Sequence, residues 1–126
     1  MKAATTKLLA KADRALAAAQ SLLDHGDPEF AISRAYYAMY YAATGILHER
    51  GLAFRKHTAI HAAVAEHFTR TGALDPKYHR WILDAFDARI TADYGVEADF
   101  TAQDAALRID RAREFAAAVR KLLQAP

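Results

Sequence analysis

The sequence of 126 residues contains no cysteine. Disulfide bonds, thiolate nucleophiles and zinc sites with cysteine ligands are therefore excluded. The chain also lacks the run of about 20 apolar residues that a membrane-spanning helix needs, since its longest apolar stretch, residues 35–47, is interrupted by Thr44 and Gly45. Lysines and threonines break up the N-terminal segment, so we expect no secretion signal there. We expect a cytoplasmic protein with no membrane contact.

Neither sign of charge predominates, because 17 lysines and arginines face 15 aspartates and glutamates and leave a net charge of +2. The charges are interspersed and form no block of the kind found in nucleic-acid-binding tails. Overall charge thus predicts no nucleic-acid binder, although a local site stays open. The length is near the commonest size of one domain, so residues 1–126 are expected to form a single domain.

Apolar residues recur every three or four positions along most of the chain, which indicates helices. No alternating strand pattern, internal repeat or long linker interrupts them. Long helices joined by short loops pack as antiparallel neighbours, so we predict an all-α, up-and-down bundle of four to five helices. The helices are expected to end near His25-Gly26, at Gly51, at Gly72 and near Tyr94-Gly95, and starts are expected at Asp27-Pro28, His57, Asp75-Pro76 and a capping box from Thr101.

One arginine interrupts the apolar face of the fourth predicted helix. This face carries Tyr78, Ile82 and Ala85, and Arg89 occupies the next position on it. A guanidinium stays charged, so it needs acceptors if it is buried, or its stem covers apolar surface while its head reaches water. Asp93 follows four residues later on the same face. The pair either orients the guanidinium for a ligand or is a surface ion pair worth about 0–1 kcal/mol.

Four tyrosines, at positions 36, 37, 40 and 41, fall within one and a half turns of the second predicted helix. They fit base stacking or phosphate contacts, but tyrosines more often fill a bundle core or a dimer interface. Arg34 shares a helix face with Tyr37 and Tyr41 and is available as a cation beside these rings.

Two histidines have the spacing of a metal-binding helix, but we predict no metal or cofactor there. His57 and His61 are four residues apart, as in zinc-binding helices. However, Thr58 stands where the HExxH motif has its glutamate, and no third ligand is indicated. His57 is instead expected at the start of a helix, with its ring against a neighbouring helix.

Two segments resemble a known family. Residues 32–40, ISRAYYAMY, look like the sRaYYAmF stretch of HEPN-domain proteins, and Gly51 and His57 follow in the same order. Residues 89–94, RITADY, resemble the R-x-x-A-D-Y motif of a subgroup of these proteins. Together with the closing amphipathic helix, the resemblance covers nearly the whole chain.

The resemblance implies a four- or five-helix bundle that often pairs two-fold. Many HEPN proteins are metal-independent RNases with an R-x4–6-H site assembled across the dimer, and many are encoded beside a minimal nucleotidyltransferase that neutralises them. We therefore expect a homodimer, a minimal nucleotidyltransferase antitoxin as partner, and RNA or a nucleotide as ligand. The catalytic candidates are Arg89, Asp93 and Tyr94, and the substrate-binding candidates are Arg34 and Tyr37.

The chain departs from the family's catalytic pattern. Counted from Arg89, the histidine would fall at positions 94–96, which hold Tyr94, Gly95 and Val96. A tyrosine with a pKa of about 10 is a poor general base at neutral pH, although its hydroxyl still donates to a phosphate. Three hypotheses follow: an RNA-directed toxin, with endoribonuclease activity left open; a non-catalytic partner that binds a nucleotidyltransferase or a nucleotide, which the altered motif slightly favours; and a dimerisation module in which Arg89 and Asp93 are structural.

Overall fold

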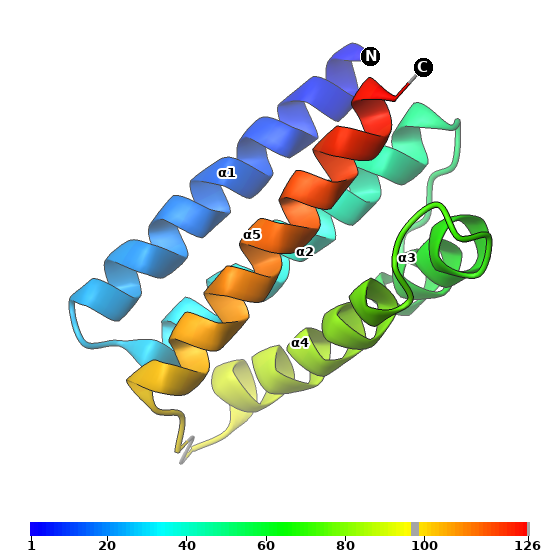
Figure 1. Ribbon diagram of the computed structural model, residues 1–126. Helices are drawn as coiled ribbons and strands as arrows, with labels where there is room; N and C mark the ends of the chain where they lie inside the picture. Colours follow the sequence, from blue (N-terminus) through cyan, green and yellow to red (C-terminus); the bar gives the residue numbers. More distant parts are fainter. Residues whose placement is uncertain (97–98, 126) are drawn as a thin grey trace.

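The computed structural model describes residues 1–96 and 99–125, which fold into helices without a strand. This confirms the all-α bundle, and none of the described helices is long and apolar enough to cross a membrane. The helices are α1 (Ala3–Asp24), α2 (Pro28–Glu49), α3 (His57–Val64), the π-helical turn η1 (Ala65–Thr69), α4 (Lys77–Tyr94) and α5 (Ala102–Gln124) (Figure 1).

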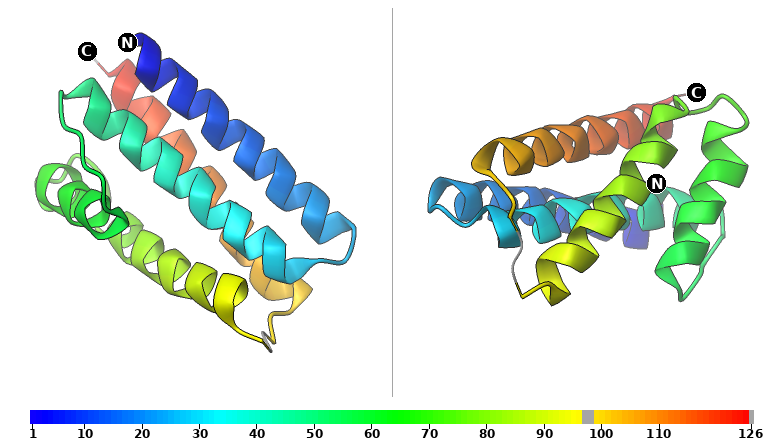
Figure 2. Two further views of the ribbon diagram at one scale, coloured as in Figure 1. Left: turned by 180° about the vertical axis from the view of Figure 1, so that it is seen from behind. Right: turned by 90° about the horizontal axis from the view of Figure 1, so that it is seen from below.

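Helix α2 is the central element. It packs against α1, α3, α4 and α5, which agrees with its apolar residues on nearly all sides. Seen from behind, α2 lies between α1 and α4 (Figure 2, left), and α5 runs along its other side. The view from below shows α4 crossing the long helices at an angle, with α3 beside it (Figure 2, right).

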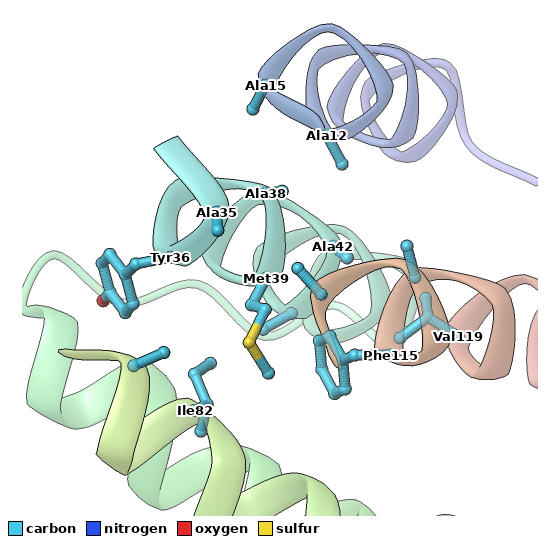
Figure 3. Packing of buried hydrophobic residues seen from close by; sticks show 14 of the residues in the cluster. Ala12, Ala15, Ala35, Tyr36, Ala38, Met39, Ala42, Ile82, Phe115 and Val119 are labelled. Carbon is cyan, nitrogen blue, oxygen red and sulfur yellow. The ribbon is translucent and has the colours of Figure 1, made fainter. Parts of the chain in front are cut away.

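The core combines small residues where the long helices meet with large residues facing α4. Alanines on α1, α2 and α5 are fully buried, so these helix backbones approach closely. Larger side chains fill the space between α2, α4 and α5, and each contributes about 1.5–3 kcal/mol by its burial. Figure 3 shows Ala12, Ala38 and Ala42 in the first group and Tyr36, Met39, Ile82 and Phe115 in the second.

The helix ends follow the expected capping chemistry in most places. Asp27 accepts a hydrogen bond from the Phe30 N–H at the start of α2, and Thr101 and Asp104 form the predicted capping box of α5. Gly51, just after α2, has a φ of 76°, a left-handed conformation that favours glycine.

The third predicted helix differs from the structure in its second half. A single α-helix was expected up to Thr71, but residues 65–69 form a π-helical turn in which the Arg70 N–H donates to the Ala65 carbonyl over 2.9 Å. Over five residues, the spacing of apolar residues cannot distinguish a π-helix from an α-helix, so the sequence held no signal for this turn. Helix α4 also begins at Lys77, directly after the proline of the expected Asp75-Pro76 start.

Candidate functional site

Arg89 lies on α4 with only 16% of its side chain exposed. One terminal N–H donates to the Tyr37 hydroxyl on α2 over 2.6 Å. Its Nε is 2.9 Å from Asp93 Oδ2, but the N–H does not point at that oxygen, so the groups form an ion pair without a hydrogen bond. A guanidinium has five N–H donors, and the described residues accept from only one of them. Arg89 therefore keeps donors for a further acceptor such as an oxyanion.

The five predicted site residues lie together around Tyr37 and Arg89. The Arg34 guanidinium is 4.7 Å from the centre of the Tyr37 ring, and that of Arg89 is 5.2 Å from it. Tyr94 is 74% exposed at the end of α4, with its ring centre 5.8 Å from the Arg89 guanidinium. Asp93, of which 22% is exposed, contacts Arg89 from the same helix. The structure thus brings two cations, two phenols and one carboxylate to one place.

A second polar group next to this site was missed at the sequence level. The buried hydroxyl of Tyr36 is 2.7 Å from Nδ1 of His57 and 2.8 Å from Nε2 of His61. His57 is the first residue of α3. Its ring stacks on that of Tyr40 of α2, with ring centres 4.2 Å apart, as expected of a ring that contacts a neighbouring helix. The only available signal was a match of spacings, since the tyrosines 36 and 40 and the histidines 57 and 61 both repeat after one helical turn.

These buried groups stay neutral at neutral pH. Burial, with smaller contributions from the nearby His57 and His79, lowers the pKa of His61 to about 4. Burial also lowers the pKa of His57, and the positive charge of Arg89 adds to this effect. Both side chains lie against the Tyr37 ring, whose centre is 6.0 Å from that of the His57 ring and 5.2 Å from the Arg89 guanidinium. Burial raises the pKa of the Tyr36 hydroxyl well above its ordinary value.

The positions of the protons in the network of Tyr36, His57 and His61 follow from the unpaired nitrogen of His61. Nδ1 of His61 is buried without a hydrogen-bond partner among the described residues. A buried unpaired N–H is costly, so the favoured tautomer of His61 carries its proton on Nε2 and donates it to Tyr36. The tyrosine then donates to Nδ1 of His57, and the His57 proton sits on Nε2. His57 thereby offers a neutral N–H donor beside the Tyr37 ring that the Arg89 guanidinium also contacts.

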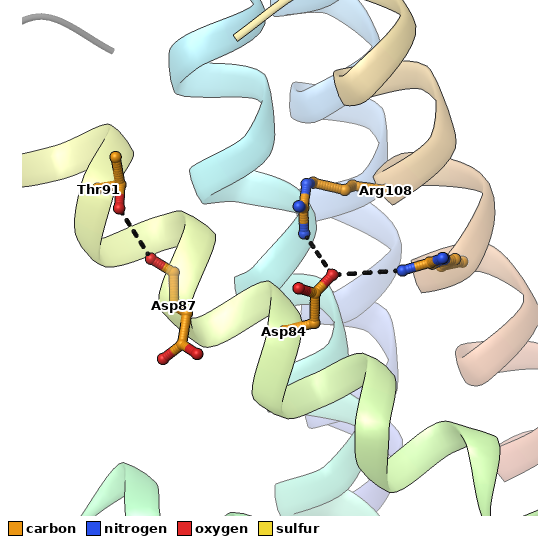
Figure 4. A network of polar contacts seen from close by, with 5 residues as sticks. Asp84, Asp87, Thr91 and Arg108 are labelled. Atoms are coloured by element: carbon orange, nitrogen blue, oxygen red, sulfur yellow. Dashed lines mark hydrogen bonds and ion pairs between the residues drawn. The ribbon is translucent and has the colours of Figure 1, made fainter. Parts of the chain in front are cut away.

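On its other side, α4 is held by carboxylates. Asp84 accepts hydrogen bonds from Arg108 and Arg111 of α5, over 3.0 and 3.3 Å (Figure 4). One turn later, the Thr91 hydroxyl donates to the backbone carbonyl of Asp87. The Asp84 contacts attach the helix that carries Arg89 to α5, whereas the Thr91 hydrogen bond lies within α4. In the part of the chain that the structure describes, no three histidine, aspartate or glutamate side chains come together as metal ligands.

Comparison with known proteins identifies the family. A family model described as the HEPN domain matches residues 5–122. The chain belongs to the HEPN family. Among relatives of this HEPN domain, "Putative toxin MJ0142" of Methanocaldococcus jannaschii is 29% identical over 117 residues, which are 93% of this chain and 80% of the relative. A UPF0332 protein of Thermotoga maritima is 31% identical over 106 residues, 84% of this chain and 80% of the relative.

The HEPN fold is also found in a solved structure. The crystal structure of TT1696 from Thermus thermophilus superposes with a TM-score of 0.80, covering 94% of this chain and 97% of that chain. The sequence identity is 21%, so this likeness supports the fold alone. In this HEPN domain, the segment that resembles R-x-x-A-D-Y forms the C-terminal end of α4, and the site around Arg89 is built on it.

Proposed function

We propose that this HEPN domain is the toxin of a toxin–antitoxin pair and acts on RNA through a phosphate-binding site around Arg89. The name of the relative MJ0142 supports the toxin context. The observation that carries the RNA-directed function is the state of the guanidinium, which is mostly buried and only partly hydrogen-bonded, and which lies against the same Tyr37 ring as the His57 imidazole. Burial of an incompletely paired cation is costly, and a phosphate would complete its hydrogen bonds.

The five residues have distinct roles in this proposal. Arg89 binds the phosphate and stabilises the charge that develops on it during attack by the ribose hydroxyl. Asp93 orients the guanidinium, and Tyr37 holds it against α2. The exposed hydroxyl of Tyr94 donates to a phosphate oxygen, and Arg34 contacts the neighbouring phosphate.

His57 takes the place of the histidine that the family motif lacks here. In the favoured tautomer, its Nε2–H donates to the phosphate beside Arg89. For His57 to act as a base, its Nε2 proton passes to water, the Tyr36 proton moves to Nδ1 of His57, the His61 Nε2 proton moves to Tyr36, and a proton from water binds Nδ1 of His61. Nε2 of His57 is then unprotonated and accepts the proton of the attacking hydroxyl. This rearrangement puts a proton on the unpaired Nδ1 of His61, at a cost of about 1–3 kcal/mol.

The decisive experiment combines growth and RNA cleavage. We expect expression of the wild type to arrest growth, and the purified protein to cleave total RNA in EDTA. Arg89→Ala should abolish both, Arg89→Lys should lose most of the activity because it lacks the planar fork, and His57→Gln should reduce it at least about 100-fold. Arg80→Ala on the exposed side of α4 is the matched control. Intact RNA with the folded wild type would refute the enzymatic proposal.

A second candidate function has its own support. Arg89 links α4 to α2 through Tyr37 and pairs with Asp93, so the pair could serve only the packing of a dimerisation or interaction module. In that case Arg89→Ala strands a largely covered carboxylate and should cost about 3–5 kcal/mol of unfolding free energy. A phosphate-binding arginine predicts a loss within about 1 kcal/mol. Urea unfolding of this variant separates the two functions.

For the partners, we propose a homodimer and a minimal nucleotidyltransferase antitoxin. Leu83, Ile90 and Tyr94 follow one face of α4 and are 41%, 39% and 74% exposed, which fits an apolar interface beside the site. Sedimentation should show a dimer at micromolar concentration that Ile90→Asp converts to a monomer. Co-expression of a minimal nucleotidyltransferase encoded beside the gene should restore growth. A monomer at high concentration, or growth arrest that persists, would contradict the respective partner.

A further inference from the structure

Cations flank two neighbouring tyrosine rings on the face formed by α1, α2 and α4. The Lys11 ammonium is 4.6 Å from the centre of the Tyr41 ring, which is 5.9 Å from that of Tyr37. Tyr37 in turn contacts the guanidinium groups of Arg34 and Arg89. Figure 2 (left) shows that α2 lies between the other two helices on this face. We call Lys11, Arg14, Arg34, Tyr37, Tyr41 and Arg89 the basic row.

The end of the basic row away from Arg89 is hollowed. A depression of about 210 Å³ lies between α1 and α2, and its polar lining consists of Lys11, Arg14, Arg34 and Tyr41. Asp13 lies between the first two in sequence, but its carboxylate faces α5, where it accepts hydrogen bonds of 2.9 and 2.8 Å from Arg120. No acidic side chain therefore lines the depression.

Three cations of the row have no carboxylate partner among the described residues. Lys11, Arg14 and Arg34 form no ion pair with a described carboxylate, whereas Arg108, Arg111 and Arg120 each do. A cation–π contact holds a cation in place but does not neutralise it. Several such charges on one face repel each other, and the fold gains little from them. Their positive charge remains available to an anionic ligand.

We propose that the basic row binds single-stranded RNA, with the backbone entering the depression at Lys11 and Arg14 and passing Tyr41 and Tyr37 to Arg89. This inference rests on the proposed function, because it supplies the strand whose phosphate Arg89 binds. Cations spaced along a groove with interleaved aromatic rings suit a strand that presents both phosphates and base faces. An acidic protein segment would use the cations but would leave the rings without a partner.

The test measures binding without cleavage. A fluorescent 2′-O-methyl oligoadenylate of about 12 nucleotides has no free 2′-hydroxyl and matches the size of such sites. We expect Lys11→Gln with Arg14→Gln to weaken its binding about tenfold at moderate salt. The slope of log affinity against log salt should fall by about 1.4, since each phosphate contact on a single strand contributes about 0.7. Binding of the dinucleotide pApA, which reaches only Arg89, should stay unchanged.

The control has the same loss of charge on another part of the surface: Arg80→Gln with Lys121→Gln, both exposed. It should bind the oligonucleotide within about twofold of the wild type, and both double variants should unfold at the temperature of the wild type. If Arg89→Ala weakens binding but the Lys11 and Arg14 pair does not, the basic row is refuted and the Arg89 site stands. If neither changes it, both proposals fall. Equal binding of poly-L-glutamate, lost in the same variant, would assign the row to an acidic protein.

Discussion

The two sides of α4 are attached to the bundle by opposite kinds of polar contact. Toward α5, Asp84 is 51% exposed and pairs with two arginines. Toward α2 and α3, the contacts are the Arg89–Tyr37 bond and the buried, neutral network of Tyr36 with two histidines. Exposed ion pairs contribute about 0–1 kcal/mol, but unpairing a buried polar group costs about 1–3 kcal/mol. The α5 side has its charges satisfied at little gain, while the α2 side stabilises the fold and leaves positive charge for a ligand.

The largest effect expected from this difference is a loss of stability in acid caused by His61. The ordinary pKa of a histidine is about 6.5, and burial holds that of His61 at about 4. Below pH 6.5 the unfolded chain binds a proton that the folded chain does not. Stability is therefore complete above pH 6.5 and falls by about 3 kcal/mol as the pH drops to about 4.

Urea unfolding at several pH values measures this loss. In His61→Gln the acid-dependent loss should shrink by about that amount, because the titrating group is gone. Ala62→Gln, which puts the same side chain at the exposed neighbouring position, should behave like the wild type. An unchanged pH dependence in the His61 variant would show that the network is hydrated and not dry.

A somewhat smaller effect is expected from Tyr36→Phe. The change keeps the ring but leaves the buried Nε2 of His61 unpaired, which should cost about 2 kcal/mol of unfolding free energy. Tyr40→Phe is the matched control, since the described residues make no hydrogen bond with that hydroxyl, and it should change stability by less than about 0.5 kcal/mol. Equal effects in the two variants would place the stabilisation in the rings.

The smallest effect is expected on the α5 side. Asp84→Asn removes both ion pairs of this carboxylate and should cost at most about 1 kcal/mol. The loss should diminish in 1 M salt, where the Debye length is about 3 Å. Thermal unfolding at two salt concentrations measures it. A loss above about 2 kcal/mol would show that the α5 side contributes more to stability than the α2 side.

Local sequence signals predicted most of the fold but only part of the site. Asp27, Gly51 and the capping box at Thr101 mark helix ends by chemistry that acts within a few residues. Arg89, Asp93 and Tyr94 share one helix end, and Arg34 and Tyr37 share one helix face, so periodicity grouped each set. Their meeting across α2 and α4 follows from α2 being the central helix.

The network of Tyr36 with His57 and His61 could not be predicted in the same way. Its hydrogen bonds join residues 21 and 25 positions apart, and they depend on how closely α3 approaches α2. Helical spacing places the two tyrosines on one face and the two histidines on another, but it does not predict that these faces meet. The π-helical turn was missed for a related reason, because its i+5 hydrogen bond leaves no mark in a short apolar pattern.

The central place of α2 also determines the order in which the helices can pack during synthesis. Among the described helices α1 comes directly before α2, so these two can pair as soon as both have left the ribosome. The remaining sides of α2 stay uncovered until α4 and α5 follow, and α5 ends 75 residues after Glu49, the last residue of α2. At about 5–20 residues per second, the apolar surface around Met39 is exposed for several seconds. The nascent half-bundle is therefore the stage at which this protein is most open to aggregation or to capture by a chaperone.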